Sequence, residues 1–231
     1  MFRNSCCISL LIIFSTLMAS AQTLQEIETK RVSLPNGWKL SPVGKMLPLG
    51  DLPLNIAVSP SQKYLAVTNN GQSDQMVQLI DAINMRVLDS VIMRKSWLGL
   101  VFSYDSRFLY ASGGNDNWIV RFALSRDKLV PRDTMVIGKP WPEKISITGI
   151  ALDDVRKLMY AVTKENSSLY VVDVNRKEVI ERFQMDAEAY TCMLSPDHTM
   201  LYISCWGCNK IILFNTEKRQ FAGSIPVGDN P

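Results

Sequence analysis

Hydrophobic and polar positions alternate along most of the chain, in short runs that end at turn residues such as Ser, Asp, Pro and Asn. Each repeated segment holds an apolar or alternating strand, a turn and a second β-rich strand, which predicts a hairpin. These four hairpin segments are residues 55–70, 99–114, 149–164 and 191–206. Third strands are expected at residues 76–82, 118–124, 169–175 and 210–216, and fourth strands near 86–92, 129–137, 179–185 and 220–227.

The register of these segments is nearly periodic. The turn positions Pro60, Tyr104, Asp154 and Pro196 lie 44, 50 and 42 residues apart, and the third-strand positions Ile80, Phe122, Val172 and Phe214 lie 42, 50 and 42 apart. Four short strands per unit of about 40 to 45 residues are typical of β-propeller blades. A β-sandwich is the all-β alternative, but it does not require this register. The sequence therefore predicts an all-β fold with four-stranded blades at about residues 52–93, 94–138, 139–186 and 187–228.

A second internal match marks the joint between blades. Residues 47–53 (LPLGDLP) return as residues 225–231 (IPVGDNP), 178 residues later, which is four periods of 44.5. Residues 43–48 precede the first copy and are expected to form a closing strand with no blade of its own. Propellers close when a strand from one terminus completes the blade built by the other. Residues 43–231 are therefore expected to be a partial propeller, with the rest of the ring beyond Pro231.

The N-terminal segment has the pattern of a secretory leader. Arg3 precedes an apolar run at residues 6–18, and Ala19 and Ala21 are small residues suited to a signal peptidase. A retained anchor is the weaker alternative, because the run is shorter than the roughly 20 residues of a spanning helix. We expect a signal peptide at residues 1–21, cleavage near Ala21, a lead-in at 22–42, a periplasmic or secreted product and no membrane span in the mature chain.

Composition narrows the set of partners. The 231 residues include 25 Lys and Arg against 22 Asp and Glu, and 47% are hydrophobic. This is ordinary globular composition, and the scattered basic residues make no patch for nucleic acid. No nucleic-acid partner is expected.

Few residues suit catalysis. General acid-base chemistry most often uses His, and His198 is the single His, placed in a turn where a solvated role is the better interpretation. We therefore expect no catalytic residue, no metal site and no cofactor in this chain.

Cys205 and Cys208 have the spacing of a dithiol motif, but they flank a turn between two strands. A disulfide between them and an ordinary turn with free thiols are therefore both open. If that hairpin turns between residues 197 and 198, Cys192 pairs with Ile203 and Cys205 pairs with Tyr190.

Loops on one face of the propeller are the candidate binding site. Links between fourth and first strands, and between second and third strands, emerge on the same side of a propeller. Aromatic rings beside amides and a few charges suit a polar, stackable ligand such as a saccharide or a peptide segment, or a protein partner. The alternative is that turns simply require Asn and Asp, and that Trp97 and Trp141 pack at blade joints. The candidates are Arg94, Trp97, Asn115, Asp116, Asn117, Lys139, Trp141, Tyr190 and Trp206.

Several blade motifs resemble the YVTN-repeat, YncE-like bacterial propellers. The motifs include Ser59-Pro60, the stretch at residues 64–69 (YLAVTN), the strand ends at 79–81 and 172–173, and the joint at 227–231 (VGDNP). Residues 34–61 resemble more closely the propeller that precedes an alkaline-phosphatase-superfamily phosphoesterase domain in secreted proteins. The resemblance implies a seven-bladed ring, with three blades and any phosphoesterase domain beyond Pro231.

These observations favour an exported propeller that acts as a non-catalytic binding or scaffold module. Two enzymatic alternatives stay open. In the first, the chain is the N-terminal part of a secreted enzyme whose phosphoesterase domain lies beyond residue 231. In the second, the propeller itself is a lactonase-like hydrolase, which needs carboxylates and amides converging on a metal in the central channel.

Overall fold

The computed structural model describes residues 31–41, 44–229 and 231, and divides the chain into two units, residues 1–46 and 47–231. The first unit contains β1 (Val32–Ser33) and β2 (Lys39–Leu40), an antiparallel pair that the hydrophobic pattern did not lead us to expect. Its turn closes through the Leu34 amide, which donates to the Trp38 carbonyl at 2.8 Å. The signal available in the sequence was Pro35-Asn36-Gly37, a turn-forming run. The predicted leader, residues 1–21, lies outside the described residues.

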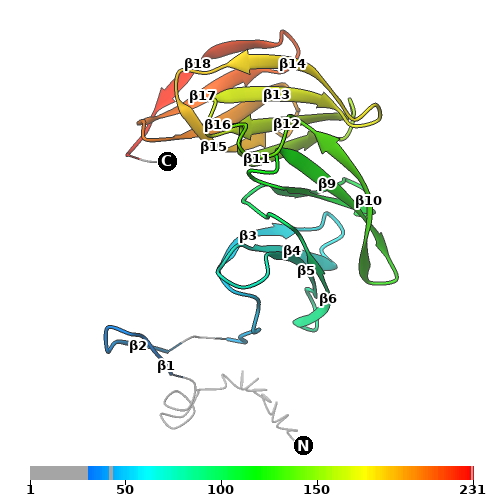
Figure 1. Ribbon diagram of the computed structural model, residues 1–231, viewed down its shortest axis with the longest axis vertical. Coiled ribbons are helices and arrows are strands. Elements are labelled where there is room, and N and C mark those ends of the chain that lie inside the picture. The colour runs from blue at the N-terminus through cyan, green and yellow to red at the C-terminus, as the bar shows by residue number, and fades with distance from the viewer. Residues whose placement is uncertain (1–30, 42–43, 230) are drawn as a thin grey trace, which may run out of the picture. The chain divides into compact units, whose positions relative to one another are not determined.

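The second unit consists of four antiparallel four-stranded sheets (Figure 1), which confirms the predicted topology. Blade 1 contains β3 (Pro53–Val58), β4 (Tyr64–Asn69), β5 (Met76–Asp81) and β6 (Arg86–Ile92). Blade 2 contains β7 (Leu100–Phe102), β8 (Phe108–Ser112), β9 (Trp118–Ser125) and β10 (Lys128–Val136). Blade 3 contains β11 (Ile147–Asp153), β12 (Leu158–Thr163), β13 (Ser168–Asp173) and β14 (Glu178–Gln184). Blade 4 contains β15 (Glu188–Leu194), β16 (Met200–Trp206), β17 (Lys210–Asn215) and β18 (Gln220–Pro226).

Residues 44–229 contain no helix, and no helix in the described part of the chain is long and apolar enough to cross a membrane. Residues 44–48, part of the expected closing strand, carry no strand, and Val43 lies outside the described residues.

The register predicted for the blade 4 hairpin is correct at one end and wrong at the other. Cys192 pairs with Ile203, as the position of the turn required. Cys205, however, pairs with Ala189 instead of Tyr190, because the register shifts between Ala189 and Thr191. Such a bulge adds one unpaired residue and increases the local twist of the strand. Equivalent shifts occur at the starts of β3 and β11, so the bulge is part of the repeat.

The hydrophobic core lies between blades. Three clusters of buried side chains join blade 1 to blade 2, blade 2 to blade 3 and blade 3 to blade 4. In the last of these, Tyr160 and Phe214 meet edge to face with ring centroids 6.4 Å apart. Each sheet is apolar on both faces, so every blade needs a neighbour to bury its side chains. The fourth strands are more exposed, and β18 is exposed along its whole length.

The first strands of neighbouring blades approach one another closely at one repeated position. This position is occupied by Asn55, Gly99, Gly149 and Thr191, one residue in each blade. The Asn55 side chain donates from Nδ2 to the Leu98 carbonyl at 2.6 Å. A Cβ on Gly149 would lie 2.6 Å from the Thr191 Cα, nearer than real Cβ contacts come. Glycine therefore lets β11 pack directly against the backbone of β15.

This contact predicts a specific cost of substitution. Gly149→Ala should lower the free energy of unfolding by about 1–3 kcal/mol, because the added methyl group must push two strand backbones apart. Gly228→Ala is the matched control, since nothing lies within 4 Å of a Cβ there. Denaturant unfolding followed by circular dichroism measures both. Equal stability of the two variants would show that the inner strands separate without cost.

On the opposite side, the first turn of each blade bonds to the first turn of the next. The Ser61 amide donates to Ser106 Oγ at 3.0 Å, and the Tyr104 amide donates to Asp154 Oδ2 at 2.8 Å. Between blades 3 and 4, His198 Nδ1 lies 3.1 Å from Asp153 Oδ1. His198 is therefore a turn residue, as expected, but its ring joins two blades and is not simply solvated.

Candidate functional site

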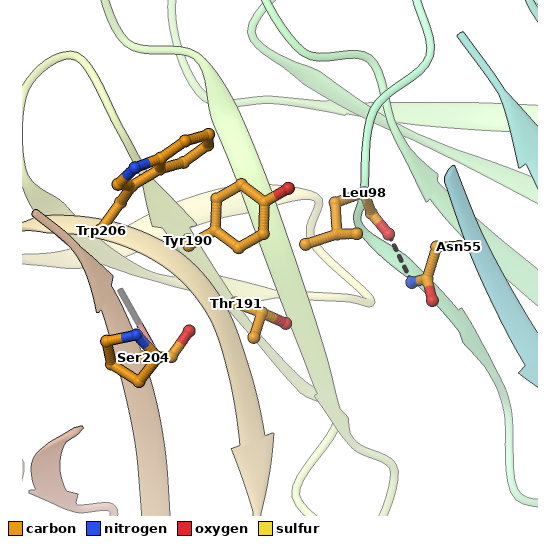
Figure 2. A pocket seen from close by; sticks show the side chains of 7 residues that line it. Asn55, Leu98, Tyr190, Thr191, Ser204 and Trp206 are labelled. Carbon is orange, nitrogen blue, oxygen red and sulfur yellow. Dashed lines mark hydrogen bonds between the residues drawn. The ribbon is translucent and has the colours of Figure 1, made fainter. Parts of the chain in front are cut away.

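A cavity with a volume of about 610 Å³ lies at the inner strands. Figure 2 shows Trp206 and Tyr190 on one side of it and Asn55 and Leu98 on the other. The lining combines aromatic and aliphatic surface with hydroxyl and amide groups, and it contains no charged side chain. It is formed by Asn55, Leu98, Tyr190, Thr191, Ser204, Trp206 and Pro231.

Two aromatic rings form the stacking surface of this cavity. Tyr190 and Trp206 meet edge to face, with centroids 4.9 Å apart and planes at 88°. This is a favoured aromatic geometry that holds both rings in place. Lys164 Nζ lies 5.0 Å from the centroid of the Trp206 ring. The bulge between Ala189 and Thr191 removes Tyr190 from the strand pairing. Trp206 ends β16 and remains about half exposed, at 47%.

The predicted site residues divide between two cavities. Tyr190 and Trp206 line the large cavity at the inner strands. Arg94, Asn115, Asp116 and Trp141 line a second, of about 370 Å³, together with Lys95 and Pro140. The predicted residues thus line two separate cavities, where the sequence suggested a single site.

Three predicted residues line neither cavity. Asn117 is fully buried, and its side chain donates to the carbonyls of Lys139 and Glu143 at 2.5 and 3.0 Å and accepts from the Ser146 amide at 2.9 Å. Its amide is therefore used to hold the loop between β10 and β11. Lys139 is exposed and takes part in that contact through its backbone. Trp97 packs over Gly114, in keeping with a structural role at a blade joint.

The cavity residues that the sequence did not single out come from the inner strands. Asn55 and Thr191 occupy the repeated position that is glycine in blades 2 and 3. The signal available in the sequence was that these two residues carry side chains at a position that is glycine in the other two blades. Ser204 and Leu98 carried no comparable pattern, because their place in the lining depends on how the blades pack.

Three cysteines, Cys192, Cys205 and Cys208, lie among the described residues. They are free thiols, and Cys205 is fully buried. Burial, together with the neighbouring Cys208, raises the pKa of Cys205 to about 12, and a thiol of this kind is a poor nucleophile. Cys208 Sγ donates to the Cys205 carbonyl at 3.7 Å, so the two cysteines belong to an ordinary turn and not to a disulfide. Within residues 31–41, 44–229 and 231, no three His, Cys, Asp or Glu side chains gather into a metal-binding group.

The four blades place the chain among the β-propellers, and comparison with solved structures agrees. Hydrazine synthase of Kuenenia stuttgartiensis is similar over 80% of this chain, at 16% identity and a TM-score of 0.65. The WD40 repeats of RRP9 are similar over 79% of it, at 13% identity and a TM-score of 0.64. The chain spans about half the length of both, 52% and 56%. No family model and no curated protein matches the sequence. At these identities the likeness concerns the propeller fold alone.

Proposed function

We propose that this propeller is a non-catalytic binding module that takes an uncharged, polar, stackable ligand at the cavity of the inner strands. One observation carries the proposal: the cavity of about 610 Å³ has an aromatic pair, the hydroxyl groups of Tyr190, Thr191 and Ser204, and an amide, but no charged side chain in its lining. Such a lining favours a ligand with a flat apolar face and hydrogen-bonding edges, as in a saccharide ring or a peptide segment. The lining includes the Ser204 hydroxyl group but no His, Asp, Glu or Lys side chain that could activate it.

Binding of neutral probes tests the proposal. The probes are maltotriose and the capped tripeptide acetyl-Gly-Tyr-Gly-amide, measured by surface plasmon resonance on the immobilised chain. Trp206→Ala should weaken binding of the preferred probe roughly tenfold or more, because the ring supplies the stacking surface. Trp38→Ala, which removes an exposed ring of the first unit, is the control and should leave the affinity unchanged. If neither probe binds, or if both variants bind equally well, the cavity is not the site.

We further propose that the chain is a YncE-like module exported through its N-terminal leader, and that it belongs to a larger propeller of seven blades. The apolar run at residues 6–18 and the motifs at 64–69 and 227–231 support this proposal. In an exporting host, the intact mass should correspond to a chain that begins at Gln22. A retained leader would overturn the export proposal. The sequence that follows Pro231 in the gene tests both the number of blades and the phosphoesterase alternative.

A further inference from the structure

The second cavity of the loop face differs from the first in its charge. It is formed by three connections, β6 to β7, β8 to β9 and β10 to β11, and has a volume of about 370 Å³. Its lining contains two cations, one carboxylate and an aromatic ring, whereas no charged side chain lines the first cavity. The lining residues are Arg94, Lys95, Asn115, Asp116, Pro140 and Trp141.

Asp116 is the least accessible group of this cavity. Its side chain is only 5% exposed, and its Oδ2 has no hydrogen-bond partner. The nearest cation is Arg94, whose Nε lies 3.6 Å from Oδ2, too far for a direct hydrogen bond. A buried carboxylate oxygen without a donor is costly, and a ligand hydroxyl or a bound water would satisfy it.

Two more buried polar atoms without partners lie in the same loops. They are Ser96 Oγ and Trp97 Nε1, next in sequence to the cationic pair Arg94 and Lys95. Neither Ser96 nor Trp97 lines the cavity, so among these unpartnered atoms only Asp116 Oδ2 belongs to a cavity residue.

Trp141 provides a flat surface beside this carboxylate. Trp141 is 59% exposed, which is high for a tryptophan, and its backbone amide donates to the Asn115 carbonyl at 3.1 Å. Asn115 is itself held by Ser146, whose Oγ donates to Asn115 Oδ1 at 2.8 Å. Asn117 holds the rest of the loop through the bonds described above. The ring is therefore presented to solvent by an anchored loop, as a stacking surface requires.

We propose that this cavity binds an acidic saccharide, with one uronic acid unit in contact with Trp141. The apolar face of the sugar ring stacks on the indole, a ring hydroxyl donates to Asp116 Oδ2, and the sugar carboxylate pairs with Arg94 and Lys95. Two cations against one carboxylate leave an excess of positive charge, which favours an anionic ligand over a neutral one. The buried acceptor requires a hydroxyl donor, so a simple anion without hydroxyl groups fits less well. This site is separate from the uncharged cavity and does not require a ligand there.

Trigalacturonate and its fully methyl-esterified form are the probes. The ester keeps the ring and the hydroxyl groups and removes the charge, so the chain, immobilised at low density, should bind the acid at least tenfold more tightly. Trp141→Ala and Lys95→Gln each change an exposed side chain, so both variants should fold normally. Trp141→Ala should weaken binding of the acid tenfold, and Lys95→Gln should weaken it several-fold. Asp116→Ala should weaken binding of the uncharged ester, because it removes the buried acceptor for the ring hydroxyl.

Trp206→Ala is the control from the other cavity and should leave trigalacturonate affinity unchanged. Absence of binding, equal affinity for acid and ester, or full affinity in Trp141→Ala would overturn the proposal. Loss of binding in Trp206→Ala would also overturn it, since the saccharide would then occupy the uncharged cavity. If neutral probes bind in a Trp206-dependent way while trigalacturonate does not bind, this proposal fails and the proposed function stands.

Discussion

The isolated chain should self-associate at micromolar concentration, because one apolar face of blade 4 is exposed. Met193, Tyr202 and Leu213 are paired across three strands of this face, and Met193 is 71% exposed. The other face of the same sheet, with Cys192 and Ile203, is buried against blade 3. Blade 1 likewise exposes Ile56 and Val58, each at 59%. Exposed apolar faces of this kind are normally covered by another sheet.

The repeat itself identifies the blade 4 face as a packing surface. The residues equivalent to Tyr202 are Ala66, Tyr110 and Tyr160 in blades 1, 2 and 3, with exposures of 0%, 3% and 1%. Each of these three packs against the next blade. Tyr202, at 38%, occupies the same place without such a neighbour. A further blade or a second copy of the chain would bury it.

Charged substitutions on this face should restore the monomer. Each apolar side chain buried in an association contributes about 1.5–3 kcal/mol, so Met193→Lys with Tyr202→Lys should weaken association by about 3 kcal/mol, or roughly a hundredfold. Val155→Lys is the control, since Val155 is 82% exposed but lies in a turn outside this face. Sedimentation velocity measures all three chains. A parent chain that stays monomeric at tens of micromolar would contradict the expectation.

Asp153→Ala should destabilise the protein more than substitution of any comparable turn carboxylate. Asp153 is fully buried and accepts from the Val155 and Arg156 amides and from the Arg156 guanidinium at 2.8 Å. It also lies 3.1 Å from His198 Nδ1, and Arg156 donates to the His198 carbonyl. Removing Asp153 therefore breaks the turn and its link to blade 4 together. We expect a loss of about 3–5 kcal/mol in the free energy of unfolding.

Asp173 supplies a matched control for this variant. It makes the same turn in the second hairpin of blade 3, accepting from the Asn175 and Arg176 amides at 2.9 Å, but it makes no link to the next blade. Asp173→Ala should cost about 1 kcal/mol, as loss of a local cap usually does. Urea denaturation compares the two variants. Equal losses would show that the Asp153–His198 link contributes nothing beyond the turn.

The same carboxylate predicts how stability changes with pH. Burial alone would raise the pKa of Asp153, but hydrogen bonds from Arg156 and His198 outweigh it and the pKa is lowered. Because the folded pKa lies below that of the unfolded chain, this stabilisation is complete above about pH 4 and is lost as the pH falls further. Asp153→Asn should lose less stability on going from pH 5 to pH 3 than the parent chain does.

The candidate site was predictable only in part. The turn residues placed Tyr190, Trp206, Arg94 and Trp141 on the loop face, and each lines a cavity. Asn117 has the same turn composition as its neighbours, yet its amide is buried and fully used by the loop. Composition does not distinguish a binding amide from a structural one, because both occur in turns. Only the hydrogen bonds made by the folded loop separate them.

By itself the sequence determined the strands, their order within each blade and most of their pairing. These features depend on the alternation of hydrophobic and polar residues and on turn residues, and both are properties of short stretches of the sequence. Tertiary structure alone decided the bulge at Tyr190, the close approach of Gly149 to Thr191, the burial of Asp116 and the division of the loop face into two cavities. The bulge depends on how two strands of one blade pair, and the other features depend on how close neighbouring blades and their loops come, which local alternation does not encode.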